Sequence, residues 1–225
     1  MTNEADFSTL GLSEQMLEAV RAKGFETPTS IQRLTIPRLL SGGNDIIAQS
    51  QTGTGKTAAF GLPILQQTEH SADGVQALVL VPTRELAVQA AEELLSFNAG
   101  RRLSITAIYG GAAMSEQLRR LSRGVDIVVG TPGRVLDHIR RGTLKLDKVR
   151  FLVLDEADEM LNMGFVEDVE EIMSHTGEDR RVLLFSATMP ERIIRLSDAY
   201  MRDTEVLRVE SQHLMTDLTN QIYFE

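Results

Sequence analysis

Short apolar segments alternate with longer amphipathic ones through most of this chain, beginning near residue 45. Seven of the apolar segments have the length and composition of strands, at 45–48, 77–81, 105–109, 126–129, 151–154, 182–185 and 206–209. Helical patterns lie between them, among them 56–67, 84–98, 115–122, 134–140 and 191–200. Such alternation is typical of parallel strands joined by helical crossovers, with helices on both faces of the sheet. We therefore predict an α/β fold with a doubly wound parallel sheet.

Length and composition fit one large domain or two small ones. A chain of 225 residues with 42% apolar residues can bury a sizeable core. It contains no cysteine, which excludes disulfides and thiolate metal sites, and its four histidines lack metal-ligand spacing. No segment is apolar enough to span a membrane and residues 1–8 show no signal-peptide pattern, so we expect a cytoplasmic protein. A net charge of −9 argues against a broadly basic surface for nucleic acid, although it allows a local basic patch.

The segment between the first predicted strand and the helix at 56–67 is suited to binding phosphate. Its residues are Ser50, Gln51, Thr52, Gly53, Thr54, Gly55, Lys56 and Thr57. They match the pattern G-x-x-x-x-G-K-S/T except that Ser50 replaces the first glycine. Glycines let backbone N–H groups approach an anion, Lys56 can reach the β- and γ-phosphates, and Thr57 can bind Mg²⁺. The alternative is a glycine-rich surface turn, which the flanking strand and helix disfavour.

A pair of carboxylates ends the predicted strand at 151–154. That segment is apolar throughout, which is typical of a strand buried on both faces. Asp155 is then placed to hold Mg²⁺ through water, and Glu156 to accept a proton from the attacking water. Runs of acids are more often solvated surface, but this pair stands at the end of a buried strand. Together with the phosphate-binding segment, the pair predicts an enzyme domain that acts on a nucleoside triphosphate.

Polar segments also follow most of the other predicted strands. In an open α/β sheet the carboxyl ends of parallel strands share one edge, and ligands bind there. Three segments are left over after a nucleotide is placed: Pro82-Thr83-Arg84, Gly110-Gly111 and Thr131-Pro132-Gly133-Arg134. Each alone reads as an ordinary strand-to-helix turn. As a set they offer the amides, hydroxyls and guanidinium groups that contact phosphates, so they favour a phosphodiester backbone as ligand.

A further candidate lies before the first predicted strand, in residues 24–32. Phe25 could stack on a base, and the Gln32 amide has the donor and the acceptor that match the N6 and N7 edge of adenine. This signal is weak when judged from the residues alone. A phenylalanine here is more often part of a core or hinge, and a glutamine more often lies on a helix surface.

Over nearly its full length the chain resembles the first RecA-like domain of DEAD-box RNA helicases. The resemblance rests on seven motifs in the family's order: residues 24–32 with Phe7 upstream, 50–57 with Ser50 for the usual alanine, 82–87, 110–111, 131–134, Asp155-Glu156-Ala157-Asp158 and Ser186-Ala187-Thr188. It implies ATP and Mg²⁺ as cofactors, and RNA as a partner held by its backbone without regard to sequence. The implied RNA contacts are Pro82, Thr83, Arg84, Gly110, Gly111, Thr131, Pro132, Gly133 and Arg134.

The resemblance also implies roles for single residues. Phe25 would stack on adenine, while Gln32 and the Thr27 backbone would read the edge of the base. Lys56 and Thr57 would hold phosphate and Mg²⁺, and Asp155 and Glu156 would serve the metal and the attacking water. Asp158, Ser186 and Thr188 would couple hydrolysis to a partner domain.

We expect residues 1–225 to form a single RecA-like domain, with residues 1–40 packed on it as the adenine-recognition segment. The family's second RecA-like domain, which would carry the arginine fingers and half of the RNA track, has no counterpart here. We therefore expect a monomeric fragment of a longer chain, nearly inactive alone. Two alternatives stay open: another P-loop enzyme, such as a kinase or an ATPase acting on protein, and a nucleotide-binding module without turnover. The three loops that a nucleotide does not use disfavour another P-loop enzyme, and Glu156 disfavours a module without turnover because pure binding needs no general base.

Overall fold

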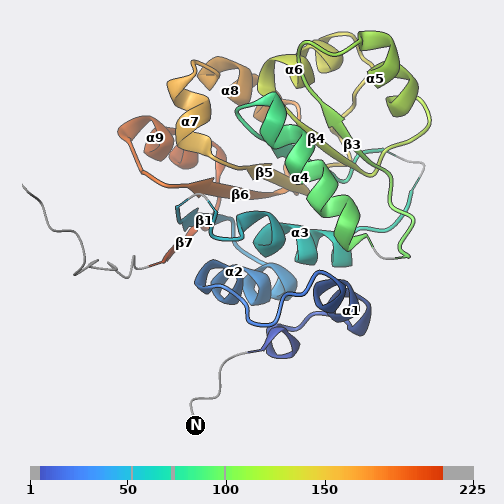
Figure 1. The fold of residues 1–225 in the computed structure, drawn as a ribbon. Coiled ribbons are helices and arrows are strands. Elements are labelled where there is room, and N and C mark those ends of the chain that lie inside the picture. The colour runs from blue at the N-terminus through green and yellow to red at the C-terminus, as the bar shows by residue number, and fades with distance from the viewer. Residues whose placement is uncertain (1–5, 52, 72–73, 99, 210–225) are drawn as a thin grey trace, which may run out of the picture.

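The structure, a computed structural model, describes residues 6–51, 53–71, 74–98 and 100–209 (Figure 1). Seven strands in this part of the chain form one sheet, and every neighbouring pair is parallel, in the order β3-β4-β2-β5-β6-β1-β7. The strands are β1 (Ile46–Gln49), β2 (Ala77–Leu80), β3 (Ile105–Ile108), β4 (Ile127–Gly130), β5 (Phe151–Leu154), β6 (Arg181–Ser186) and β7 (Glu205–Arg208). All seven predicted strands are present, with their ends within one residue of the predicted positions, so the predicted parallel α/β fold is confirmed.

Helices cover both faces of the sheet (Figure 1). One layer contains α1 (Glu14–Ala22), α2 (Ser30–Ser41), α3 (Lys56–Gln67) and α4 (Arg84–Phe97), preceded by the short 3-10 helix η1 (Phe7–Leu10). The opposite layer contains α6 (Pro132–Arg140), α7 (Ala157–Asn162), α8 (Val166–Ser174) and α9 (Glu191–Tyr200), with α5 (Met114–Leu121) beside α6. Within the described residues, no helix is both long enough and apolar enough to cross a bilayer.

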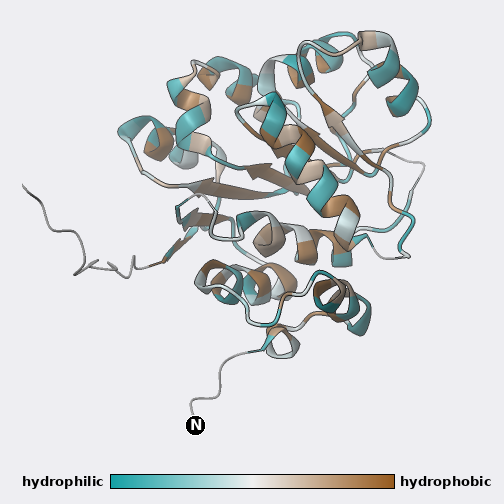
Figure 2. Ribbon diagram, viewed as in Figure 1, coloured by the Kyte–Doolittle hydropathy of each residue, from teal (hydrophilic) through white to brown (hydrophobic). Residues whose placement is uncertain are grey.

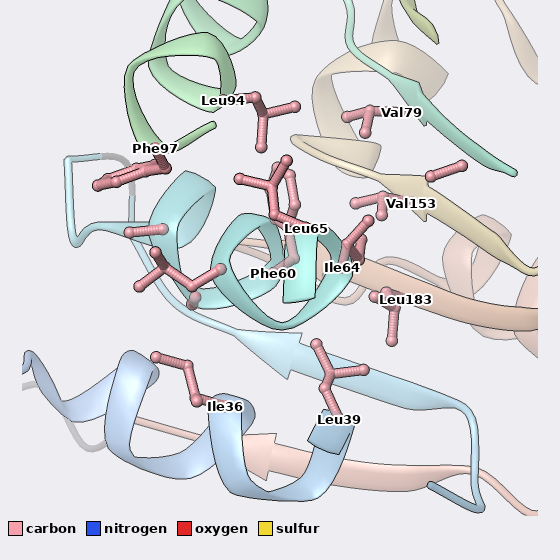
Figure 3. Packing of buried hydrophobic residues seen from close by; sticks show 14 of the residues in the cluster. Ile36, Leu39, Phe60, Ile64, Leu65, Val79, Leu94, Phe97, Val153 and Leu183 are labelled. Atoms are coloured by element: carbon pink, nitrogen blue, oxygen red, sulfur yellow. The ribbon is translucent and has the colours of Figure 1, made fainter. Parts of the chain in front are cut away.

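Alternate residues of each central strand pack into opposite layers. Val79 and Val153 lie in the cluster under α3 and α4 (Figure 3), whereas Leu78 and Leu152 belong to the second cluster. All four side chains are completely buried. In Figure 2 the central strands are mainly brown, and teal residues lie on the helices around them. Burial on both faces explains why these strands are apolar without interruption in the sequence.

Close packing fixes the helix that follows the phosphate-binding segment. A Cβ at Gly61 of α3 would lie 2.5 Å from the Leu94 side chain of α4, so glycine lets the two helices approach closely. On the other side of α3, Ile36 and Leu39 of α2 complete its burial (Figure 3). The first turn of α3, which carries Lys56 and Thr57, is thereby held in place.

Two buried aspartates organise the edge of the sheet where the strands begin. Asp45 accepts hydrogen bonds from the N–H groups of Val182 and Arg202, each at 2.7 Å. Asp126 accepts from the N–H of Ser104 at 2.7 Å and lies 2.9 Å from the His70 ring. These acids precede β1 and β4 by one residue and satisfy backbone amides, so they belong to the fold. The candidate site lies at the opposite edge of the sheet.

Candidate active site

Six loops meet at the carboxyl edge of the sheet because the strands before them run in the same direction. They follow β1 to β6, and they include every strand-following segment that the sequence singled out. Of the predicted site residues, Thr52 lies outside the described part of the chain. The six loops fall into two groups along this edge, one around Lys56 and one around Arg134.

The loop after β1 is fastened to β6 and leads directly into α3. Ser50 is buried, and its N–H donates to the carbonyl of Ser186 at 3.1 Å. The Thr54 hydroxyl lies 2.8 Å from the Gln51 carbonyl oxygen, which closes the loop on itself. Gly55 has φ +83 and is the last residue before α3. The N–H groups and the positive end of the helix dipole of α3 therefore lie at this edge, as an anion site requires.

Gln32 lies inside the protein and contacts the loop, contrary to the usual surface position of a helical glutamine. It is only 3% exposed. Its Oε1 accepts the Thr29 N–H at 2.9 Å, and its Nε2 donates to the Gly55 carbonyl at 3.1 Å. A Cβ at Gly55 would lie 2.5 Å from that Nε2, so this position also needs glycine. Each end of the amide keeps one further hydrogen-bonding position, an acceptor and a donor.

Phe25 packs against the core along one edge. Its ring meets that of Phe97 in α4 edge to face, with the ring centroids 5.9 Å apart. The Lys23 ammonium lies 5.6 Å from the centroid of the same Phe97 ring. Phe25 is half-buried and Thr27 is exposed. Phe25 is therefore anchored on Phe97 while part of its surface is accessible.

A buried ion cluster lies where the loops after β1 and β5 meet. Lys56 Nζ is 3.3 Å from Asp155 Oδ1 and 3.9 Å from Glu156 Oε1. Lys56 and Asp155 are 6% and 8% exposed. Burial raises the pKa of both carboxyls, and the Lys56 ammonium opposes that shift. The structure thus brings together the three residues to which the sequence assigned catalysis.

Glu156 has a backbone conformation that favours glycine. Its φ is +54 and its ψ +49, a left-handed conformation that costs an ordinary residue about 1–2 kcal/mol. Its N–H donates to Asp155 Oδ1 at 3.0 Å, and α7 begins at the next residue. Strain of this kind is often found at functional sites, where the surrounding structure enforces it.

The donors at this position suit Mg²⁺. Oxygen ligands are available from Asp155, from Glu156 and from Thr57 in the first turn of α3. Across the described residues, no group of three or more His, Cys, Asp or Glu side chains could hold a metal ion by itself. Mg²⁺ typically takes one or two carboxylates together with substrate phosphates and water, so this donor set fits a metal that arrives with a nucleotide.

The predicted coupling residues also lie together. Asp158 Oδ2 accepts from the Thr188 hydroxyl at 2.8 Å and from the Thr188 N–H at 2.9 Å. The Ser186 hydroxyl donates to the Thr188 carbonyl at 2.7 Å. Burial by itself would raise the pKa of Asp158, but hydrogen bonds led by those from Thr188 outweigh it and hold this pKa below its usual value. The end of β6 is therefore tied to α7, directly after the carboxylate pair Asp155-Glu156.

The second group of loops is built around two arginines. The Arg84 guanidinium lies 5.2 Å from the centroid of the Tyr109 ring, at the end of β3. Arg134 Nη1 donates to the Ala112 carbonyl at 3.2 Å, directly after Gly110-Gly111. The three loops proposed to contact a phosphodiester backbone are thus in contact with one another.

Two helices begin at these loops. The Thr83 hydroxyl accepts the Leu86 N–H at 3.2 Å and caps α4. Pro132 occupies the first turn of α6, where its missing N–H costs nothing, and the Thr131 N–H donates to the Ile108 carbonyl. Two helix N-termini therefore lie beside the arginines, and both favour anions.

Three polar residues at these sites were not recognised in the sequence. Glu93 of α4 is half-buried beside Thr57: burial raises the pKa of its carboxyl, and a hydrogen bond from the Thr57 hydroxyl opposes this. Gln117 and His138 are buried between the arginine loops. The only signal available was a polar residue on an otherwise apolar helix face, and many surface helices show the same pattern.

A phosphate-binding loop, a carboxylate pair after a buried strand and a sheet of this order define a P-loop domain of the RecA type. A family model for DEAD/DEAH box helicases matches residues 29–196. The DEAD box protein from Methanococcus jannaschii, known from a crystal structure, has a TM-score of 0.87 and 49% identity over 90% of this chain and 55% of that chain. A hypothetical ATP-dependent RNA helicase from Sulfolobus tokodaii has a TM-score of 0.81 and 36% identity over 88% of this chain and 57% of that chain.

Two curated relatives are similar over nearly all of this chain. ATP-dependent RNA helicase CshA of Limosilactobacillus reuteri is 50% identical, over 96% of this chain and 44% of the relative. DEAD-box ATP-dependent RNA helicase CshA of Geobacillus kaustophilus is 49% identical, over 97% of this chain and 47% of the relative. This chain belongs to the DEAD/DEAH box helicase family. It spans slightly less than half the length of these relatives.

Proposed function

We propose that this chain is the ATP-binding domain of an ATP-dependent RNA helicase. It binds ATP with Mg²⁺ at the Lys56 cluster and an RNA backbone at the Arg84 and Arg134 loops, and acts with a second RecA-like domain. The observation that carries this proposal is the buried contact of Lys56 with Asp155 and Glu156 on the sheet edge that also carries the arginine loops. The names of the curated relatives, ATP-dependent RNA helicases, support the same function.

At the nucleotide site, Lys56 exchanges its carboxylate partners for phosphate oxygens when ATP binds. The amides at the start of α3 hold the same phosphates. Asp155 and Thr57 would hold Mg²⁺, which neutralises charge on the transferring phosphoryl group. Glu156 follows Asp155 directly, with its Oε1 3.9 Å from Lys56 Nζ, and it accepts the proton of the attacking water.

At the RNA site, the contacts are made to phosphates rather than to bases. Arg84 and Arg134 provide guanidinium groups, and the first turns of α4 and α6 provide backbone N–H groups. Such contacts read no sequence, and the affinity that they provide falls steeply as salt concentration rises.

The phosphate loop is linked to the predicted coupling residues through the end of β6. The Ser50 N–H donates to the Ser186 carbonyl, and Ser186 in turn contacts Thr188, the partner of Asp158. A shift of the phosphate loop on hydrolysis would therefore displace the loop after β6. We propose that this loop transmits the displacement to the second domain.

RNA-stimulated hydrolysis tests the proposal. In a chain extended by a second RecA-like domain, single-stranded RNA should stimulate ATP hydrolysis, and Arg84→Ala or Arg134→Ala should weaken this stimulation. A kinase or an ATPase acting on protein would hydrolyse ATP without regard to RNA. A binding module would not turn over in either condition. Either outcome would contradict the proposal.

Adenine selectivity gives a separate prediction for the 225-residue chain. ADP should bind more tightly than GDP, because guanine presents O6 where adenine presents N6–H₂ to the Gln32 amide. An unpaired buried polar group costs about 1–3 kcal/mol, which corresponds to roughly five- to a hundredfold in affinity. Titration calorimetry with both nucleotides measures the ratio.

Gln32→Ala should remove this preference. The substitution also removes the hydrogen bond to Gly55, so it weakens ADP and GDP together, and only their ratio reports on base recognition. Equal affinities in the parent chain, or an unchanged ratio in Gln32→Ala, would show that another residue reads the base.

A further inference from the structure

We propose that Gln117 and His138 are positioning residues, which hold the loops after β3 and β4 in a single arrangement suited to RNA. The inference rests on the proposed RNA contact of these loops. Neither residue lies in the motifs that the function uses, and both are almost fully buried, with exposures of 5% and 0%. Buried polar groups need partners. Gln117 has its partners at the proposed RNA loops, in Tyr109 and Arg134, and His138 is bonded to Gln117 and Thr143.

The partners of Gln117 fix the orientation of its side-chain amide. Nε2 lies 3.0 Å from the Tyr109 carbonyl, which can only accept a hydrogen bond. Oε1 lies 3.3 Å from Arg134 Nη1, which can only donate. A flipped amide would face a donor with a donor and an acceptor with an acceptor, so a single orientation satisfies both ends.

That orientation determines the proton on His138. Its Nε2 lies 3.1 Å from Gln117 Oε1, an acceptor, so Nε2 carries the hydrogen and donates. Its Nδ1 lies 2.9 Å from the Thr143 hydroxyl, which also lies 3.0 Å from the His138 carbonyl and has one hydrogen to donate. When the ring is neutral, Nδ1 has no hydrogen and accepts this one. Burial lowers the pKa of His138, and the charge of Arg134 lowers it further, which favours the neutral ring. The side chain therefore has one tautomer and one partner at each nitrogen.

Together these bonds hold the Gly110-Gly111 loop at both ends. Gln117 binds the carbonyl of Tyr109 before the two glycines, and Arg134 binds the carbonyl of Ala112 after them. Gly111 has φ +82, a left-handed conformation that glycine adopts readily. Without these bonds, a loop of two glycines could adopt many other conformations. The same bonds direct Nη1 of Arg134 inward and leave the other N–H groups of the guanidinium for a ligand. Because Arg84 lies over the Tyr109 ring, the third loop is aligned as well.

A merely structural role would have different consequences. The polar contacts of Gln117 and His138 are made with the loops after β3 and β4 and with Thr143, whereas Lys56, Asp155 and Glu156 form their own cluster between the loops after β1 and β5. Loss of positioning should thus weaken RNA binding and leave nucleotide binding unchanged. General destabilisation would instead reduce both affinities.

The test compares substitutions that keep or remove the hydrogen bonds. Gln117→Met keeps the volume of the side chain and loses all three of its hydrogen bonds, and His138→Leu loses the donor to Gln117. His138→Gln retains a donor near the Nε2 position. We measure the binding of a short fluorescein-labelled single-stranded RNA to the 225-residue chain by anisotropy at low salt, with ADP affinity and the thermal midpoint measured in parallel.

Gln117→Met and His138→Leu should weaken RNA binding by roughly three- to tenfold, the worth of one or two neutral hydrogen bonds. His138→Gln should stay within about twofold of the parent, and ADP affinity should not change in any variant. Thr143→Val, at an exposed position, is a milder second variant in case Gln117→Met does not fold. It removes the Nδ1 partner of His138 and should weaken RNA binding in the same direction.

Arg134→Ala distinguishes a failure of the proposed RNA contact from a failure of the proposed positioning role. If it leaves RNA affinity unchanged, the proposed RNA contact itself is wrong. If Arg134→Ala weakens RNA binding but Gln117→Met, His138→Leu and Thr143→Val do not, the RNA contact stands and the positioning role is overturned. A parallel loss of ADP affinity, or a failure of His138→Gln to restore RNA binding, would also overturn it.

Discussion

In a chain that also carries a second RecA-like domain, replacing Glu156 by glutamine should slow ATP hydrolysis by about 10²–10⁴-fold, the usual worth of a general base. The amide keeps the size of the side chain but cannot accept the proton of the attacking water. ATP affinity should stay close to that of the parent, because Lys56 and the start of α3 still hold the phosphates. Single-turnover hydrolysis and nucleotide titration measure the two effects separately.

Lys56→Ala is the matched comparison. Lys56 contacts phosphate in the ground state and in the transition state alike, so its loss should weaken ATP binding as well as hydrolysis. It would also leave Asp155 buried without its ion partner. Hydrolysis at the parental rate in Glu156→Gln would assign the base to another residue.

The fold was predictable because its central strands are buried on both faces. β5 is apolar from Phe151 to Leu154, and its exact limits were predicted from this run alone. The one-residue differences at β1 and β4 have a common cause. Asp45 and Asp126 were counted as strand residues, but each precedes its strand, and their side chains bind backbone amides of neighbouring segments. Sequence patterns show that a residue is polar and do not show which amide it binds.

The candidate site was predictable where one loop contains all its residues, and less so where distant segments meet. The phosphate loop follows a known spacing, so Lys56 and Thr57 were identified directly. The contact of Gln32 with the Gly55 carbonyl joins two segments that no pattern relates. The left-handed backbone of Glu156 is enforced by its surroundings, because a glutamate has no such preference of its own. Gln117 and His138 were missed because their role depends on contacts with residues that lie elsewhere in the sequence.

The 225-residue chain, tested by itself, should hydrolyse ATP very slowly and show no appreciable stimulation by single-stranded RNA. Lys56, Asp155 and Glu156 lie together and approach the phosphates from one side. The arginines described at this edge, Arg84 and Arg134, contact Tyr109 and Ala112 instead. An arginine finger on the opposite side is worth about 10³–10⁵ in rate in related phosphoryl transfer. The curated relatives are more than twice as long as this chain, which leaves room for such a group in their remaining half.

Steady-state ATPase assays with and without RNA test this expectation, first on the chain alone and then on its fusion to the C-terminal half of the Geobacillus kaustophilus relative. Fusion is preferable to mixing, because a linker raises the effective concentration of a weakly bound partner domain. RNA stimulation should appear only in the fusion, since ATP and RNA can favour a closed state only when two domains are present to close. Strong stimulation of the chain alone would mean that it completes its own site. A specific activity that rises with protein concentration would then identify a second copy of the chain as the source of the missing cation.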